Sequence, residues 1–411
     1  MFVCKEGVMA GALDGIKILE LTRVGPGAFC TMMLADMGAE VLKIEAPPSD
    51  KLAGSGASPG PKDAKKLATS FTNRNKKSLT LNLKDPAGQA VLQDLAKSYD
   101  VLLEGYRPGV MKRLGGDYDT LKKLNPRLIY CALSGFGQDG PYRDYPAHDL
   151  NYLSLAGVAD LIGPTEGLPS IPLNIIADYA GASMHGVTGI MFALFARERT
   201  GKGQFVDISY LDTTLSLLAA TPNVRDYFAD DVMPGRGNGV FGGGHAYYSF
   251  YNTKDGKMIT IGCTEPWLFH NLCDALNRPD LKDCAMKAGD FSGPPHERHV
   301  HARAELQKIF LTKTREDWFE FLTKADVCVG KVYSVPEAFN DPQIRHRQMA
   351  VELDHPVAGK VTQAGVAVKL SDTPGSIRSF APAIGEHSDE VLRGLGYSAA
   401  KIAELREKRV V

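Results

Sequence analysis

The first 220 residues alternate between short aliphatic runs, in which apolar residues tend to repeat at every second position, and longer runs with helical spacing. Residues 16–22 (IKILELT) form the first aliphatic run, and the Gly-Pro-Gly turn at 25–27 follows it. Helical spacing follows over 28–37, and Gly38 precedes a second apolar run at 41–45. This order predicts a strand, a helix and a second parallel strand, which together form one βαβ unit.

The same alternation continues to residue 220. Further strands are predicted at 79–83, 99–104, 128–134 and 205–209. Helices are predicted at 85–98, up to 125, at 179–198 and at 211–220. Parallel strands need crossover connections, usually helices, which then cover both faces of the sheet. The fold class expected is therefore α/β, with a mostly parallel sheet in a Rossmann-like large domain.

The pattern changes near residue 230. Glycines and prolines gather in 233–244, which suits a mobile flap or a linker. A hairpin around Asp255-Gly256 and a helix opened by Pro266 follow. We therefore predict a large domain at 1–229, a smaller α+β domain at 230–340 and a C-terminal segment at 341–411 that returns to the large domain. The aromatic residues near the hairpin could line an acyl pocket or only fill the core: Tyr247, Tyr248, Phe250, Tyr251 and Trp267.

The composition is that of an ordinary soluble globular protein, with 44% hydrophobic and 23% charged residues. The 47 Lys and Arg residues balance 48 Asp and Glu residues, which leaves a formal net charge of -1. This balance gives no reason to expect a nucleic acid or an acidic membrane surface as a partner. A bound phosphate would have to be held by a local group of donors.

The cysteines are odd in number and widely spaced: Cys4, Cys30, Cys131, Cys263, Cys273, Cys284 and Cys328. Without a C-x-x-C pair they favour neither a disulfide framework nor a metal cage, so we expect reduced thiols and no metal site. The first residues do not form a signal peptide, and no run reaches the ~18 apolar residues of a membrane helix. The sequence therefore predicts a cytoplasmic protein without a membrane span.

Two proton-carrying side chains, His148 and Asp178, are each followed closely by apolar and small residues. Such surroundings can bury an ionisable group and shift its pKa, which suits acid–base chemistry. The alternative is that each residue is a helix cap or a satisfied hydrogen-bonding group. Asp178 also lies just before the apolar helix predicted at 179–198, whose N-terminal dipole could stabilise the carboxylate.

A basic turn, Asn73-Arg74-Asn75-Lys76-Lys77-Ser78, precedes a predicted strand. Its donors would suit a phosphorylated ligand, although a solvated basic turn fits the same residues. Tyr106 and Arg107 follow the carboxyl end of the next predicted strand, where open α/β sheets bind ligands. The turn at 25–27 is similar to a dinucleotide-binding turn, but the Gly-x-Gly-x-x-Gly pattern is absent, which argues against nicotinamide.

Short motifs follow one another along nearly the whole chain: Leu13-Asp14-Gly15-Ile16, Gly25-Pro26-Gly27, Leu34-Ala35-Asp36-Met37-Gly38-Ala39-Glu40-Val41, Asn73-Arg74, Lys77-Ser78, Tyr106-Arg107-Pro108-Gly109, Gly201-Lys202-Gly203-Gln204 and Gly385-Glu386-His387. In number and order they resemble the family III CoA-transferases of the CaiB/BaiF type. The resemblance implies a Rossmann-like large domain, a small domain and an interlocked dimer. It also implies an acyl-CoA thioester as the substrate, with coenzyme A as part of that substrate and no permanently bound cofactor.

Two chemistries occur in the family that this chain resembles. In its transferases, an aspartate at the position of Asp178 attacks the acyl-CoA and forms a mixed anhydride. In its α-methylacyl-CoA racemases, that aspartate and the histidine of a His-Asp-x-Asn-Tyr motif carry protons. This chain has the motif at 148–152, and Glu265 resembles the glutamate that supports the histidine. The resemblance therefore assigns Asp178, His148 and Glu265 to catalysis and favours a racemase or epimerase of 2-methyl acyl-CoA.

The resemblance also suggests the residues that bind CoA: Lys43, Arg74, Lys77, Arg107, Asn151 and Tyr152. Three features favour a transferase, namely a flap-like Gly242-Gly243-Gly244-His245, a long loop at 46–70, and Ala46 where racemases often have an arginine. A CoA-transferase with a carboxylic acid acceptor is therefore an alternative function. A non-catalytic subunit is a further alternative, and the partner chain could be identical or different.

Overall fold

The computed structural model describes residues 11–23, 25–47 and 64–411, and its chain divides into two compact units. The first unit extends to Tyr152 and includes Asn174–Thr213 and Phe339–Val411, and the second comprises Leu153–Leu173 and Thr214–Ala338. The boundary predicted at residue 229 thus differs from the one observed at Thr213. Leu153–Leu173, predicted in the large domain, belongs to the second unit, where the Arg236 side chain donates to backbone carbonyls of this segment.

A six-stranded parallel sheet organises the first unit, as the sequence predicts. Its strands are β1 (Lys17–Leu21), β2 (Glu40–Glu45), β3 (Lys76–Thr80), β4 (Val101–Glu104), β5 (Ile129–Ser134) and β6 (Phe205–Ser209). They lie in the order β3-β2-β1-β4-β5-β6, so the direction of strand addition reverses between β1 and β4. This order is the doubly wound Rossmann arrangement, in which the reversal point is the usual place for a ligand. The strand predicted at 79–83 begins earlier, at Lys76, because Lys76 already pairs with Val41 of β2.

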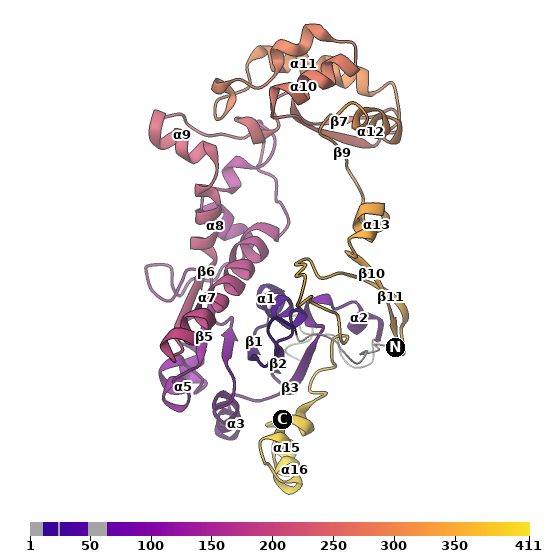
Figure 1. Ribbon diagram of the computed structural model, residues 1–411. Coiled ribbons are helices and arrows are strands. Elements are labelled where there is room, and N and C mark those ends of the chain that lie inside the picture. Colours follow the sequence, from indigo (N-terminus) through magenta and orange to yellow (C-terminus); the bar gives the residue numbers. More distant parts are fainter. Residues whose placement is uncertain (1–10, 24, 48–63) are drawn as a thin grey trace. The chain divides into compact units, whose positions relative to one another are not determined.

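Helices cover both faces of this sheet (Figure 1). On one face lie α1 (Gly25–Asp36) and α7 (Met184–Thr200), which contact each other, and α7 also contacts β5 and β6. The opposite face carries α3 (Pro86–Ala96), α5 (Tyr118–Leu124), α15 (Ser388–Gly394) and α16 (Ala399–Glu407). The apolar residues of these four helices form one core with the strands, so the C-terminal segment completes the large unit. With both faces covered, every residue of β4 and β5 is buried.

Shorter elements complete the first unit: α2 (Ala64–Ala68), η2 (Phe71–Asn73), α4 (Val110–Arg113), α6 (Asp149–Leu155), η4 (Ile175–Ser183), α14 (Pro342–His346), β10 (Ala350–His355) and β11 (Gly359–Ala364). α6 continues into the second unit, and α8 (Tyr210–Ala219) and α13 (Val335–Asn340) also cross the boundary. Of the loop predicted at 46–70, residues 48–63 lie outside the described residues, and α2 occupies part of the remainder.

The second unit is built on the antiparallel sheet β7 (Tyr248–Asn252), β8 (Met258–Gly262) and β9 (Val329–Lys331). The predicted hairpin is confirmed, with Gly256 at φ 72° in the turn between β7 and β8. The remaining elements are η3 (Ala159–Leu161), α9 (Pro222–Asp230), η5 (Val240–Gly242), α10 (Pro266–Ala275), η6 (Pro279–Cys284), η7 (Ala288–Asp290), α11 (Glu297–Phe310) and α12 (Arg315–Thr323). Side chains of α10, α11 and α12 pack with the sheet in one core.

One helical stretch, Ile175–Thr200, is long and apolar enough to cross a membrane by length and composition. This finding differs from the expectation that no stretch meets that criterion. A core helix of a soluble protein meets it too, and this stretch contacts α1, β5 and β6 within the first unit. The criterion therefore assigns no membrane role by itself.

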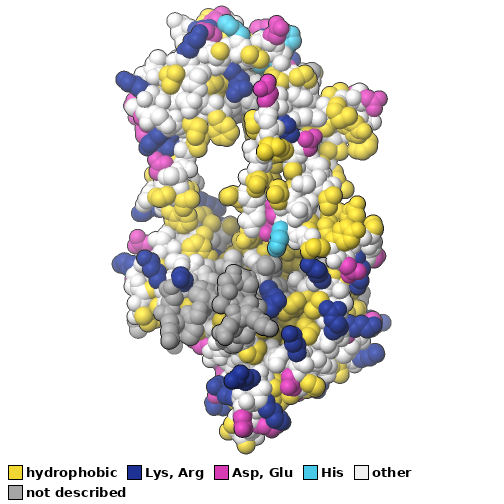
Figure 2. All heavy atoms as spheres, turned by 180° about the vertical axis from the view of Figure 1, so that it is seen from behind, with side chains coloured by type: hydrophobic (Ala, Val, Ile, Leu, Met, Phe, Trp, Pro, Cys, Tyr) yellow, Lys and Arg dark blue, Asp and Glu magenta, His cyan; other side chains and the backbone are white. Residues whose placement is uncertain are grey.

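The charges at the end of the first unit alternate in sign, in keeping with the balanced composition. Figure 2 shows Lys and Arg side chains interspersed with Asp and Glu at the lower end of the view, over α15 and α16. Ion pairs there join Lys401 to Glu404 at 2.8 Å and Arg406 to Asp389 at 2.6 Å. Exposed pairs of this kind contribute only about 0–1 kcal/mol each, so they favour solubility more than stability.

Candidate functional site

A pocket of about 700 Å³ opens at the carboxyl edge of the sheet in the first unit. The residues that follow four neighbouring strands line it: Arg23, Gly25 and Pro26 after β1, Gly105 to Pro108 after β4, Gly135 after β5 and Tyr210 after β6. The pocket therefore includes the reversal point between β1 and β4, where doubly wound sheets bind ligands. His148 and Asp178 both line it.

Asp178 lies near the start of the π-helical segment η4, which continues directly into α7. The Asn174 side-chain amide donates to Asp178 Oδ2 at 3.0 Å. The buried Asp149 accepts the backbone N–H groups of Ala177 and Asp178 through Oδ2, each at 3.0 Å. Asp149 thus caps η4 and fixes the backbone that carries Asp178. Short π-helical segments are rare in proteins, and those that do occur are often found at functional sites.

The surroundings of Asp178 make its carboxyl group a weaker acid. Burial raises the pKa of Asp178 above its ordinary value, and the charge of Asp149 adds to this effect. The hydrogen bond from Asn174 and the charge of His148 act in the opposite direction. The helix dipole was expected to stabilise the carboxylate, but Asp149 already accepts the first N–H groups of η4, and the net shift is upward. A raised pKa suits a group that both accepts and donates a proton.

His148 immediately precedes α6, and its backbone is hydrogen-bonded to Asn151 and Tyr152 of the same motif. The His148 carbonyl accepts the N–H groups of Asn151 at 2.8 Å and Tyr152 at 3.3 Å. Asn151 Oδ1 in turn accepts the His148 N–H at 3.0 Å, and the Tyr152 hydroxyl donates to the Ala147 carbonyl at 2.9 Å. Asn151 and Tyr152 therefore position His148 in this structure, while the exposed imidazole faces the pocket that Asp178 lines.

The end of β5 approaches the Tyr152 ring too closely for any side chain. A Cβ atom on Gly135 would lie 2.6 Å from the Tyr152 hydroxyl oxygen, so this position requires glycine. Burial raises the pKa of Tyr152 to about 12, with a further contribution from the charge of Asp178. Tyr152 therefore stays neutral and serves as part of the pocket wall.

The basic residues of the pocket differ from those that the sequence suggested. Arg107 lines it as predicted, together with Arg23 and Arg143. Arg143 Nε donates to the Gln138 carbonyl at 2.8 Å. Among the described residues, neither Arg23 nor Arg107 makes a side-chain hydrogen bond or ion pair, and both are exposed. These two guanidinium groups can therefore meet an anionic ligand.

Arg74 does not line the pocket, and its guanidinium group is bound by other groups of the protein. Its guanidinium group is buried and forms a fork with Asp36, through Nε at 3.0 Å and Nη2 at 2.6 Å. Nη1 donates to the Ala364 carbonyl and, at 3.3 Å, to Gln363. Arg74 therefore ties the end of α1 to β11 in the C-terminal segment, and this geometry gives no support to its predicted contact with CoA.

Lys43 and Lys77 do not line the pocket either. Lys43 is buried and donates to the Asn73 side chain at 2.9 Å, with Glu45 at 3.6 Å. Lys77 forms an exposed ion pair with Glu390 of α15 at 2.7 Å. The structure thus brings Asp178, His148, Arg107, Asn151 and Tyr152 to one pocket. The other three predicted CoA contacts, Lys43, Arg74 and Lys77, lie outside its lining and stay predictions.

Glu265 belongs to the second unit, where it precedes α10. The Thr264 hydroxyl donates to Glu265 Oε2 at 3.0 Å. Its proposed support of His148 stays a prediction.

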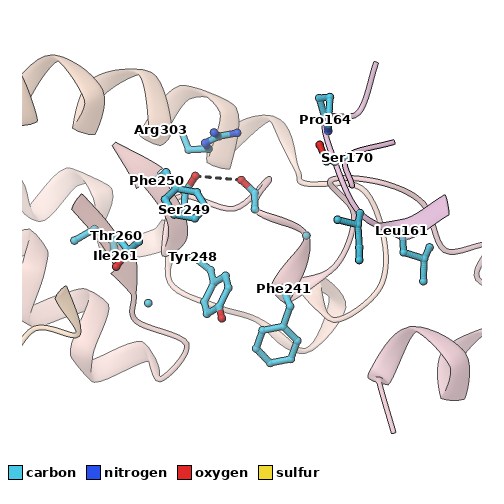
Figure 3. A pocket seen from close by; sticks show the side chains of 15 residues that line it. Leu161, Pro164, Ser170, Phe241, Tyr248, Ser249, Phe250, Thr260, Ile261 and Arg303 are labelled. Atoms are coloured by element: carbon cyan, nitrogen blue, oxygen red, sulfur yellow. Dashed lines mark hydrogen bonds between the residues drawn. The ribbon is translucent and has the colours of Figure 1, made fainter. Parts of the chain in front are cut away.

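A second pocket of about 700 Å³ lies within the second unit (Figure 3). Gly242 and Gly243 of the predicted flap form part of its wall, and the Ser249 hydroxyl donates to the Gly243 carbonyl at 3.1 Å. Of the aromatic residues near the hairpin, Tyr248 and Phe250 line this pocket, while Tyr247 and Tyr251 are buried in the core. The hairpin therefore lines a pocket with one face and fills the core with the other, because successive side chains point to opposite faces of a strand. Its role as an acyl pocket stays a prediction.

Sequence reasoning overlooked Arg23 and Asn174, which line the first pocket, and the role of Asp149 as the cap of η4. Arg23 could have been found, because it follows the carboxyl end of β1 as Arg107 follows that of β4. The sequence identified Asp149 only as a member of the His148 motif and gave no sign that it caps η4. Asn174 carries no local signal, since its contact with Asp178 depends on the π-helical backbone.

Replacing Asp149 by alanine is expected to destabilise the chain by about 1–3 kcal/mol, because the N–H groups of Ala177 and Asp178 lose their acceptor in a largely buried setting. Urea unfolding followed by circular dichroism measures the loss. Asp144→Ala is the matched control, because this carboxylate forms an exposed ion pair with Arg143, and its loss should cost less than about 0.5 kcal/mol. Equal unfolding midpoints for the two variants would refute the capping role.

Comparisons with known proteins agree with this geometry. Residues 13–388 match the model of the family described as CoA-transferase family III. The chain is 34% identical to an alpha-methylacyl-CoA racemase of Homo sapiens, covering 97% of both chains. It is also 34% identical to the succinyl-CoA–L-malate CoA-transferase beta subunit of Chloroflexus aurantiacus, covering 97% of this chain and 98% of the relative. The crystal structure of a CAIB/BAIF family protein from Brucella suis is similar at a TM-score of 0.77 and 28% identity, covering 94% of this chain and all of that one.

Proposed function

Because this chain belongs to CoA-transferase family III, we propose that it is an acyl-CoA racemase or epimerase that inverts the α-carbon of a 2-methyl acyl-CoA. The family membership makes it an enzyme of the racemase or the CoA-transferase kind, since its relatives with 34% identity include both. One observation carries the choice of racemase: two proton-carrying side chains, His148 and Asp178, line one pocket.

The chemistry of inversion needs such a pair. The hydrogen on the α-carbon of a thioester is a weak acid, so one group must remove it while another returns a proton to the opposite face. The Cα–H bond breaks, its electron pair moves toward the thioester carbonyl, and an enolate forms. In our proposal Asp178 and His148 carry out the two transfers and exchange roles with the direction of inversion. The raised pKa of Asp178 brings its basicity closer to that of an imidazole.

The pocket also has groups that could bind the phosphates of the CoA part of the substrate. Arg23 and Arg107 are exposed at its lining, and a guanidinium group matches the geometry of a phosphate oxygen pair. We therefore propose that the CoA phosphates lie near these two arginines, in place of Lys43, Arg74 and Lys77. Glu265 is retained in the proposal as the group that supports His148.

A CoA-transferase is the second candidate, and two observations favour it. The transferase beta subunit from Chloroflexus aurantiacus is as similar to this chain as the human racemase is. Gly242 and Gly243 also line a pocket of the second unit, as a segment that shields a reactive intermediate would. In this case Asp178 would attack the thioester carbonyl, form an acyl anhydride and release CoA as the thiolate for transfer.

Proton NMR distinguishes the two candidates. A chiral 2-methylacyl-CoA is incubated with the purified chain in deuterated water, and a second tube also contains succinate as the CoA acceptor. Deuterium at the α-carbon with loss of optical purity, and no new CoA ester, supports the racemase. A new CoA ester without exchange at the α-carbon refutes it and establishes a transferase.

His148→Ala is expected to lower the rate of α-proton exchange by about 10²–10⁴-fold, because the variant loses one of the two proton carriers. The rate of any CoA transfer should change much less, since transfer requires only Asp178. His346→Ala is the control, because that exposed histidine of α14 lies outside the pocket. Exchange at the parent rate in His148→Ala would remove His148 from the mechanism.

A further inference from the structure

Three buried side chains of the second unit meet at one point. They are His245, which follows the glycine-rich segment 239–244, Asp290 of η7 and His299 of α11. One ligand atom from each lies within 4.8 Å of the others. His299 Nε2 is 3.3 Å from Asp290 Oδ2, and His245 Nε2 is 4.0 Å from Asp290 Oδ1.

Several polar atoms at this point lack a hydrogen-bond partner. Both imidazoles have 0% exposure, yet His245 Nε2 and both ring nitrogens of His299 make no hydrogen bond. The buried Tyr247 hydroxyl, whose ring stacks on His245 at 5.1 Å, has none either. Such atoms are costly to bury without a partner, and few other buried side-chain atoms among the described residues share this condition.

We propose that His245, Asp290 and His299 form a binding site for a divalent transition-metal ion of the zinc type. Two imidazoles and one carboxylate are a donor set that Zn²⁺ accepts. Ligand atoms around a tetrahedral Zn²⁺ lie about 3.3–3.5 Å apart. The 3.3 Å between His299 Nε2 and Asp290 Oδ2 matches this separation, whereas His245 Nε2, at 4.0 Å from Asp290 Oδ1, would have to move closer. The fourth position would be filled by water or by the Tyr247 hydroxyl.

The neighbouring groups orient the ligands as metal sites require. His245 Nδ1 is 3.1 Å from the Gly239 carbonyl, and a proton held there leaves Nε2 as the acceptor that a metal needs. Arg298 Nη2 donates to both oxygens of Asp290, at 2.9 and 3.1 Å, and the Lys287 N–H donates to Oδ2 at 2.9 Å. These bonds fix the carboxylate and leave a lone pair of Oδ1 available to a metal ion.

The site would connect three stretches of chain that are distant in sequence. The 239–244 segment already contacts the stretch after η7, since the Gly239 N–H donates to the Gly293 carbonyl at 2.8 Å. A metal held by His245, Asp290 and His299 would fasten this segment to α11. Because Gly242 and Gly243 line the pocket of the second unit, the ion would set the shape of that wall. The role is structural and does not depend on the reaction proposed above.

Metal analysis of the untagged full chain tests the site. The protein is stripped with a chelator, dialysed against Zn²⁺, then against metal-free buffer, and analysed by mass spectrometry for metal content. The parent chain should retain about one Zn²⁺ per molecule and unfold at a higher temperature than the stripped chain. Loading with Co²⁺ in place of Zn²⁺ should give the visible absorption of a tetrahedral complex. A parent chain that retains no zinc would overturn the proposal, whatever the variants do.

His299→Ala and Asp290→Asn should reduce the retained zinc at least about tenfold, because each removes a ligand. His301→Ala is the matched control, since this histidine lies on the same helix, α11, but is exposed, and it should retain zinc as the parent does. Equal zinc in the parent and all three variants would place the metal elsewhere and refute the site. If His299→Ala does not fold, Asp290→Asn and the parent chain decide the question.

Discussion

Asp178→Asn is expected to lower turnover by about 10³-fold or more in both assays, racemisation and CoA transfer, while the chain stays folded. An amide can neither accept the α-proton nor attack a thioester, so both candidate reactions lose the group they share. The amide has nearly the same shape as the carboxylate, and its oxygen can still accept the Asn174 amide hydrogen. The loss should therefore concern chemistry more than structure.

Stability should not fall in this variant. The pKa of Asp178 is higher in the folded chain than its ordinary value, so the ionised form costs free energy on folding at neutral pH. This cost is absent at acid pH, where the carboxyl group is protonated in both states, and grows as the pH rises above the ordinary pKa. A neutral asparagine avoids it and no longer repels Asp149. Asp178→Asn should therefore melt at the parent temperature or slightly above it at pH 7.

Two measurements check this expectation. The rates come from the NMR assay above, and differential scanning calorimetry at pH 7 gives the melting temperatures. Parent-like turnover would exclude Asp178 from the chemistry. Lost turnover together with a lower melting temperature would mean that Asp178 supports the fold. In the parent chain, the acid limb of the pH profile of kcat/KM should lie above the pKa of an ordinary aspartate, because burial raises the pKa of Asp178.

Lys76→Met is expected to destabilise the chain by about 3–5 kcal/mol, because it leaves the buried Glu20 carboxylate without its cation. Lys76 Nζ lies 2.7 Å from Glu20 Oε2, and both side chains have 0% exposure. The same nitrogen donates to the Thr31 hydroxyl at 2.7 Å and the Ala28 carbonyl at 2.9 Å. One ammonium group thus connects β1, α1 and β3, and methionine would leave all of these acceptors short of a donor.

The groups around Glu20 keep its carboxylate ionised. Burial is the largest single influence and raises the pKa of Glu20, but the charges of Lys76 and Lys43, together with hydrogen bonds from Lys76 and Thr31, lower it to about 2. A lowered pKa contributes stability above the unfolded value near 4.5, and this contribution disappears as the pH falls from about 4.5 to about 2. In Lys76→Met, this acid-sensitive contribution should already be missing at neutral pH.

Urea unfolding at pH 7 measures the effect, and two matched variants show its cause. Lys77→Met changes the adjacent lysine of the same strand, whose pair with Glu390 is exposed, and should cost less than about 0.5 kcal/mol. Glu20→Gln combined with Lys76→Met removes both charges and should recover most of the loss. If Lys76→Met and Lys77→Met are equally stable, the buried pair does not support the fold.

The sequence alone was sufficient for the features that depend on local spacing. The alternation of strands and helices in the first 220 residues predicts a parallel sheet, and the six strands are found. Periodicity is a property of neighbouring residues, so it can be read without the fold. The motifs from Leu13 to His387 were also enough to identify the family, which the match over 13–388 confirms. Arg107 was found because ligands collect at the carboxyl ends of parallel strands.

The tertiary structure decided what each polar residue does. From sequence alone, the turn from Asn73 to Ser78 could be a phosphate site or a solvated turn. The structure instead buries two of its cations, Arg74 and Lys76, against Asp36 and Glu20. Their partners lie 38 and 56 residues away, and no local pattern shows that burial. Likewise, the cap that Asp149 gives to η4 exists only once α6 and η4 pack together. Charge, burial and pairing arise from contacts across the chain, so only the folded structure determines them.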